Sequence, residues 1–262
     1  MVHRTARESA DDRSSVAALY EDKQTANAYL EKRMQFSWQR LLHRRQVEIL
    51  SSTIADRRPA SVLELAPGPA RVSVDVSGVS RGVMVENSEE MIRIARKRLQ
   101  QRGLDAVWSV LGGSAFDLES VLGDQKFDLA YAFRFIRHFR EAERAQLYRA
   151  IRERLGGDGV LVFDVVNRSV RDALNDRKPD AARDELNVFD ATYASDTFRS
   201  EMQQHGFRVV GFHPVIAHFR VQAWLCHKGD DLLPGIVAML VKILEVVPSN
   251  APLEWVAICA KD

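Results

Sequence analysis

Two short stretches of the chain place a tight turn and a carboxylate where a nucleoside could bind. The apolar run Ser61–Leu65 stops at the Pro67–Pro69 turn, a pattern typical of a buried strand that ends abruptly. Gly68 has no Cβ and lets the backbone approach a ligand closely. A second apolar run, Gly82–Val85, ends in Glu86. An acidic side chain about 20 residues after such a turn is placed to accept hydrogen bonds from ribose hydroxyls.

These stretches resemble two joined motifs of the class I S-adenosylmethionine-dependent methyltransferases. Val62–Arg71 is similar to the first motif, in which an apolar strand leads into Gly-x-Gly-x-Gly, and Glu86–Met91 is similar to the second. The chain departs from the first motif at two of its three glycines, where it has Ala66 and Ala70. Alanine disfavours positive φ, so a loop that needs the left-handed region at Ala66 would be strained.

The resemblance implies an α/β protein with a Rossmann-like, seven-stranded, mostly parallel sheet, helices on both faces and an antiparallel last strand. Residues 58–262 would form this domain, with an insertion around residues 168–194 that shapes the substrate pocket. Apolar residues at helical spacing predict helices within residues 14–57. Because such a segment often closes over the cofactor in this family, residues 1–57 are expected to form a helical cap. Topology favours a short helix over Ala70–Ser77, although its valines alternate with the period of a strand.

The resemblance also implies S-adenosylmethionine as the cofactor, S-adenosylhomocysteine as its product, and no metal. Glu86 would hold the ribose, and Glu64 would orient the loop or accept from the amino group. Ser114 stands where the family usually has an Asp that accepts from the adenine amino group; alternatively it is a turn residue, and the following backbone reads the adenine edge. The other residues expected at the cofactor are Ala66, Pro67, Gly68, Asn87, Met91, Ala115, Phe116 and Phe133.

His138 is the candidate for a catalytic or substrate-contacting base. It follows the fourth expected strand, in a loop that often carries histidines in the family, and imidazole titrates near neutral pH. The alternative is a histidine that orders this loop. Arg134 and Arg137 either select an anionic substrate or lie in solvent. The candidate substrate contacts are Tyr20, Tyr29, Arg33, Arg134 and Asn167.

The composition favours a small molecule over nucleic acid or a membrane as the partner. The 262 residues carry a net charge of +1 with a pI of about 7.9, so no strong field favours a polyanion. Two cysteines without metal spacing indicate a reduced, cytoplasmic protein. The apolar run 232–247 is short for a membrane span. We expect a helix over residues 230–247 to be buried against the sheet; the alternatives are a lining for an apolar substrate and a homodimer contact.

These observations predict an enzyme that transfers a methyl group to a small-molecule acceptor by direct in-line displacement. A dinucleotide-dependent oxidoreductase would need Gly-x-Gly-x-x-Gly spacing, which the sequence lacks. An RNA methyltransferase would need a basic face and usually a motif such as Asn/Asp-Pro-Pro-aromatic, where this chain has Ala132–Phe135. A non-catalytic nucleoside-binding module is the other alternative, because Ala66, Ala70 and Ser114 each weaken an expected contact. No motif identifies the acceptor atom.

Overall fold

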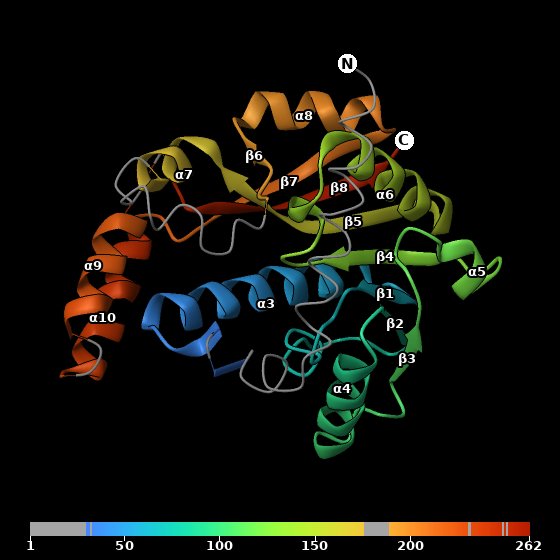
Figure 1. Cartoon of the computed structure of the whole chain (residues 1–262), viewed down its shortest axis with the longest axis horizontal. Helices are drawn as coiled ribbons and strands as arrows, with labels where there is room; N and C mark the ends of the chain where they lie inside the picture. The colour runs from blue at the N-terminus through green and yellow to red at the C-terminus, as the bar shows by residue number, and fades with distance from the viewer. Residues whose placement is uncertain (1–29, 32, 176–188, 230–231, 248, 250) are drawn as a thin grey trace, which may run out of the picture.

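A mixed sheet with the strand order β3-β2-β1-β4-β5-β8-β7 forms the centre of the computed structural model, which describes residues 30–31, 33–175, 189–229, 232–247, 249 and 251–262 (Figure 1). Among the described strands, the pairings of β8 with β5 and with β7 are antiparallel, and the other pairings are parallel. The predicted sheet with its antiparallel last strand is therefore confirmed, and the two-residue β6 is added beside β5. The strands are β1 (Val62–Leu65), β2 (Gly82–Glu86), β3 (Trp108–Gly112), β4 (Phe127–Ala132), β5 (Leu155–Asn167), β6 (Thr192–Tyr193), β7 (Phe207–Val215) and β8 (Glu254–Lys261).

Helices cover both faces of the sheet, which is why the central strands are apolar on both faces. Along β1, Val62 belongs to one core layer, and Leu63 and Leu65 belong to the other. The first layer is completed by α3 (Ser37–Arg57), α4 (Glu89–Gln101), α9 (Phe219–Gly229) and α10 (Pro234–Val246). The second is completed by α5 (Leu118–Leu122), the 3-10 helix η1 (Ile136–His138), α6 (Glu141–Arg154) and α8 (Ser195–Gln204). The remaining helix, α7 (Arg168–Asn175), directly follows β5.

Helix α3 is a layer of the core. Its buried apolar side chains recur at helical spacing, and Leu42, Ile49 and Leu50 pack into the first layer. Figure 1 shows α3 lying along one face of the sheet. Residues 1–29 lie outside the described residues, so the helical cap over residues 1–57 and the boundary at residue 58 stay predictions.

The connection from β1 to β2 differs from the short helix expected over Ala70–Ser77. It consists of successive turns, in which the N–H groups of Asp75 and Val76 both donate to the Val72 carbonyl at 3.0 Å. Val72 is buried in the first layer, and extended chain leads on to β2. The alternating valines thus pack against the core without a regular helix, and the expectation from topology was wrong.

The apolar helix α10 is not buried against the sheet as expected. It forms a hairpin with α9 at one end of the molecule and packs on α9 and α3, so only part of its surface is covered (Figure 1). Val237 and Val241 are buried, but Ile236, Met239 and Ile243 are 50%, 54% and 51% exposed. The physical reason is that α10 packs on α9, a helix that the sequence analysis did not predict.

The contact between β2 and β3 can be tested at Gly82. A Cβ at Gly82 would lie 2.2 Å from a ring carbon of Trp108. We expect Gly82→Ala to lower the free energy of unfolding by about 1–3 kcal/mol, because overpacking forces the ring or the strand to move. Gly157→Ala in β5 is the matched control, since its Cβ would meet no atom within 4 Å. Urea denaturation measures both, and equal midpoints would contradict the packing.

Candidate functional site

The side chain of Glu86 joins the end of β2 to the turn after β1. These strands pair in parallel, so their carboxyl ends meet at one edge of the sheet. Glu86 is buried, and its Oε2 accepts a hydrogen bond from the Gly68 N–H at 2.9 Å. Its Oε1 accepts from the N–H groups of Asn87 and Ser88 at 2.9 and 3.0 Å. The structure therefore brings together the turn and the carboxylate that the sequence singled out.

The Glu86 carboxylate has room for a further donor. A carboxylate offers about four acceptor sites, and three backbone N–H groups occupy three of them. Burial raises the pKa of Glu86, and the hydrogen bonds from Ser88, Gly68 and Asn87 oppose that shift. The group is thus a fixed acceptor at the carboxyl edge of a parallel sheet, where ligands bind in this class of fold. A ribose hydroxyl fits this arrangement.

All three glycine positions of the first motif adopt the left-handed region. The φ angles are 49° at Ala66, 56° at Gly68 and 54° at Ala70. An L-residue in this region costs about 1–2 kcal/mol, so the strain foreseen at Ala66 is present and extends to Ala70. A Cβ at Gly68 would meet no atom within 4 Å, so the space beside the turn is open. An open turn of this kind lets a ligand approach the backbone.

The other predicted cofactor residues differ in burial. Asn87 is exposed, whereas Met91 is buried in α4. The Oγ of Ser114 accepts a hydrogen bond from the Phe116 N–H at 3.2 Å. This contact is the one expected if Ser114 is a turn residue, the alternative to a residue that recognises adenine. Pro67, Ala115 and Phe133 are buried, as Met91 is. Cofactor contacts from these residues stay predictions.

Glu64 lies behind the turn in a buried polar cluster. It accepts a hydrogen bond from the Ser73 hydroxyl, and Tyr131 lies beside it. Burial raises the pKa of Glu64 to about 7, although Ser73, Tyr131 and Arg71 all oppose the shift. The carboxyl group is therefore close to half protonated at neutral pH. Its bond to Ser73 matches the loop-orienting role, and its contact with a bound amino group stays a prediction.

A chain of side-chain hydrogen bonds ties the turn to α3. Arg71 donates from Nη1 to His43 Nδ1 at 2.8 Å and from Nη2 to Gln46 Oε1 at 3.1 Å. Because arginine only donates, His43 accepts at Nδ1 and donates from Nε2 to Asp75 at 2.8 Å. Burial and Arg71 lower the pKa of His43, which favours this neutral form. The sequence analysis missed this network, because His43 and Arg71 are 28 residues apart and no local pattern joins them.

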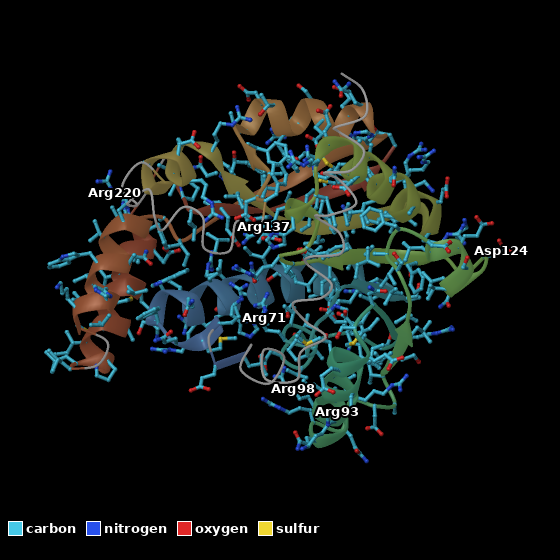
Figure 2. All side chains as sticks on the ribbon, in the orientation of Figure 1. Arg71, Arg93, Arg98, Asp124, Arg137 and Arg220 are labelled. Carbon is cyan, nitrogen blue, oxygen red and sulfur yellow. The ribbon has the colours of Figure 1, made fainter. Side chains whose placement is uncertain are left out.

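Arg137 lies in a buried ion cluster, so the expectation that it lies in solvent was wrong, and selection of an anionic substrate stays a prediction. Its side chain is 8% exposed, and its Nη1 lies 3.1 Å from Asp164 and 3.4 Å from Glu254. Its Nε lies 3.1 Å from Asp190, which also pairs with Arg171. Figure 2 shows Arg137 and Arg71 in the middle of the molecule. Three carboxylates converge on one guanidinium here, so Arg137, which follows β4, joins β5 to the amino end of β8.

His138 has the contacts of a residue that orders its loop. Its Nδ1 lies 3.1 Å from the Phe189 carbonyl and 3.1 Å from Asp190. Burial and the neighbouring Arg137 lower the pKa of His138 to about 3. The imidazole is therefore neutral near pH 7 and a weak base, so the titration argument for a catalytic base does not hold. A catalytic role for His138 stays a prediction supported by its position alone.

The predicted substrate contacts are not gathered into one site by the described structure. Asn167 is buried; its amide donates to the Pro252 carbonyl at 2.9 Å, and its Oδ1 accepts from Ser169 at the start of α7. The Arg134 N–H donates to Asp164 at 2.6 Å, with a φ of 60° at Arg134. Arg33 is partly exposed before α3. Tyr20 and Tyr29 lie outside the described residues. These contacts stay predictions.

Comparison with known proteins agrees with the fold. Residues 62–159 match the family model described as a methyltransferase domain. Magnesium protoporphyrin IX methyltransferase from Synechocystis, solved with bound S-adenosylhomocysteine, has a TM-score of 0.59 and 10% identity, with 86% of each chain covered. Mitomycin 7-O-methyltransferase has a TM-score of 0.52 and 15% identity, over 81% of this chain and 53% of that one. No curated protein matches the sequence.

A further similar structure was solved with its ligands bound. An O-methyltransferase of neocarzinostatin biosynthesis, in complex with S-adenosylmethionine and 2-hydroxy-5-methyl naphthoic acid, has a TM-score of 0.52 and 12% identity, over 82% of this chain and 56% of that one. The chain thus spans about half the length of the two O-methyltransferases. At these identities the structural similarity shows the fold. Together with the methyltransferase-domain model that matches residues 62–159, it agrees with the resemblance to the class I methyltransferases.

Two further findings concern metals and membranes. Within the described residues, no group of three or more His, Cys, Asp or Glu side chains could hold a metal ion. In the same part of the chain, every helix is too short or too polar to cross a bilayer.

The strain in the turn predicts an unusual effect of glycine. Ala66→Gly and Ala70→Gly should each raise the free energy of unfolding by up to about 1 kcal/mol, because relief of left-handed strain outweighs the added freedom of the unfolded chain. Ala150→Gly in α6 is the matched control and should destabilise by about 1 kcal/mol. Thermal or urea denaturation measures all three. Destabilisation by both turn variants would refute the left-handed assignment.

The raised pKa of Glu64 predicts how stability depends on pH. The unfolded carboxyl group loses its proton near its model value of 4.5, and the folded one near pKa 7, so the folded state binds more protons between these values. The contribution of Glu64 to stability should therefore fall as pH rises through this window. Glu64→Gln should remove that component. Urea denaturation from about pH 4.5 to pH 7.5 measures it, and parallel curves for the two proteins would be the contrary result.

Proposed function

We propose that this chain transfers a methyl group from S-adenosylmethionine to a small-molecule acceptor by direct in-line displacement. The observation that carries the proposal is the buried Glu86 carboxylate, fixed beside the open Gly68 turn at the carboxyl ends of β1 and β2. The matched methyltransferase domain supports it, since it spans both elements.

The residues of the site have distinct parts in this proposal. Glu86 accepts from the ribose hydroxyls, and the backbone of the Gly68 turn borders the methionine part. The bound donor supplies a sulfonium methyl group that is already electrophilic. The chain holds the acceptor in line and excludes water, so proximity supplies much of the rate. A strong base is not required, which agrees with the low pKa of His138.

The acceptor is a small organic molecule in this proposal. The names of two similar structures, those of mitomycin and neocarzinostatin biosynthesis, support such an acceptor without fixing the atom that is methylated. The open turn gives no reason to prefer a non-catalytic module, and no described feature favours RNA as the acceptor. A cytoplasmic location and a homodimer stay predictions.

Binding of S-adenosylhomocysteine tests the role of Glu86. Glu86→Ala should weaken binding by about 1–3 kcal/mol, because a buried hydrogen-bonding partner is lost. Glu89→Ala, an exposed carboxylate three residues later, is the matched control and should bind as the unchanged protein does. Isothermal titration calorimetry measures both variants, and circular dichroism checks that they are folded. Equal affinity for a folded Glu86→Ala variant would remove Glu86 from the site, and no binding by the unchanged chain would favour a different function.

A further inference from the structure

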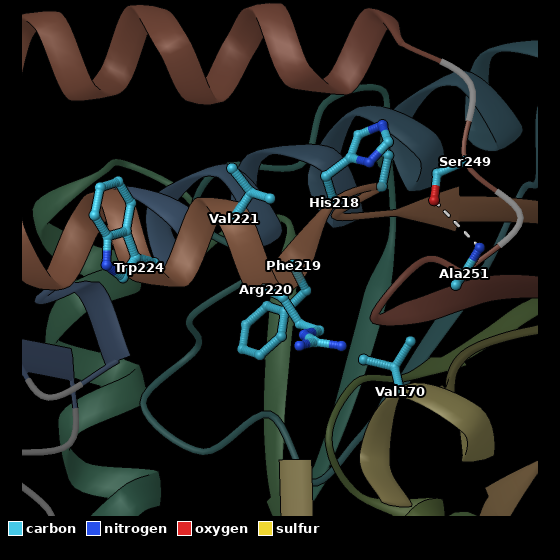
Figure 3. Close-up of a pocket in the computed structure, with 9 residues that line it drawn as sticks. Val170, His218, Phe219, Arg220, Val221, Trp224, Ser249 and Ala251 are labelled. Atoms are coloured by element: carbon cyan, nitrogen blue, oxygen red, sulfur yellow. Dashed lines mark hydrogen bonds between the residues drawn. The ribbon is translucent and has the colours of Figure 1, made fainter. Parts of the chain in front are cut away.

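A cavity of about 570 Å³ lies on the other half of the sheet from the Glu86–Gly68 site. Its walls are α7, α9 and the segment that leads into β8 (Figure 3). No residue predicted to bind the cofactor or the acceptor lines it. The lining residues are Val170, Ala217, His218, Phe219, Arg220, Val221, Trp224, Ser249 and Ala251.

The lining is mostly apolar, and its polar groups are engaged except for one cation. His218 lies 3.0 Å from the Val247 carbonyl, and Ser249 accepts from the Ala251 N–H at 3.2 Å. Within the described part of the chain, no acceptor or carboxylate pairs with Arg220. Figure 3 shows its guanidinium reaching from α9 toward Val170 of α7. An unpaired guanidinium beside apolar walls is suited to a ligand that carries one negative charge.

The cavity opens at the same edge of the sheet as the Glu86–Gly68 site. Helix α7 follows the carboxyl end of β5, α9 follows that of β7, and β8 begins there because it is antiparallel. β5, which leads into α7, lies two strands from β1, and β7, which leads into α9, lies four strands from β1, so the cavity begins about 10 Å along the edge and extends to about 19 Å at the usual strand spacing. One extended small molecule can therefore reach from the end of β4 toward the cavity.

We propose that this cavity binds an apolar aromatic anion, a carboxylate or sulfonate. The anionic group pairs with Arg220, and the ring system lies against Phe219 and Trp224. The volume lies within the range of small-molecule sites, which are mainly apolar with a few polar groups. In the proposed methyl transfer this ligand is the end of the acceptor remote from the reacting atom, a step that rests on the proposed function.

Fluorescence titration with 1-anilinonaphthalene-8-sulfonate tests the cavity without any cofactor. The full chain should bind this probe, and Arg220→Ala should weaken binding by about fivefold, as expected for a partly exposed ion pair. Arg220→Lys should retain part of the affinity. Lys228→Ala is the matched control, because Lys228 is an exposed cation of α9 that does not line the cavity. N-phenyl-1-naphthylamine lacks the sulfonate, so Arg220→Ala should leave its affinity unchanged while Trp224→Ala weakens both probes.

Two results would overturn the assignment. One is equal affinity of Arg220→Ala and the unchanged chain for the sulfonate probe. The other is loss of binding in an Ile236→Ser/Ile243→Ser variant, which would place the probe on the exposed face of α10. Arg220-dependent binding by a chain that does not bind S-adenosylhomocysteine would support the cavity while refuting the proposed function. Binding of S-adenosylhomocysteine without Arg220-dependent probe binding would support the proposed function and refute the cavity as an anion-binding site.

Discussion

The hydrogen bonds of the Glu86 carboxylate hold the carboxyl edge of the sheet in its shape. Ala66 and Ala70 each sit in the left-handed region at a cost of about 1–2 kcal/mol, so the turn needs a compensating interaction. Hydrogen bonds to a charged group contribute about 1.5–3 kcal/mol each, and Glu86 accepts three of them from backbone N–H groups. The bond to Gly68 acts directly on the strained loop. The carboxylate that would hold the ribose thus also stabilises the turn beside it.

Buried polar and charged side chains connect the turn after β1 to β8. Gln46 of α3 donates to Glu254 at 2.7 Å and accepts from Arg71, so β8, α3 and the turn are linked through one amide. Glu254 in turn faces Arg137. Unpaired charges at such depth would be costly, and burial raises the pKa of Glu254, which favours its neutral form and limits the charge on the cluster.

The sequence was sufficient to predict those strands and turns whose local residue pattern agrees with their packing in the fold. The β1 turn and the tip of β2 at Glu86 were predictable, because apolar runs and chain breakers specify strands and their ends, and the antiparallel β8 was predictable from the family resemblance. The Arg137 cluster was not, since Arg137 and Glu254 are 117 residues apart and nothing in either segment indicates the other. The low pKa of His138 could not be predicted from the sequence either, because burial and the neighbouring Arg137 cause it.

The carboxyl edge of the sheet is divided between two kinds of chemistry. At β1 and β2 it presents backbone N–H groups and a carboxylate, which suit the hydroxyls of a sugar. Around β4, β5 and β8 it is occupied by buried ion pairs between Arg137 and the carboxylates of Asp164 and Glu254, so these charges are paired within the protein. Beyond them, at α7 and α9, it presents aromatic walls and one unpaired guanidinium. A polar donor and an apolar acceptor would therefore be recognised by opposite ends of one edge, and the rigid ionic segment between them would fix the distance that a reacting molecule must span.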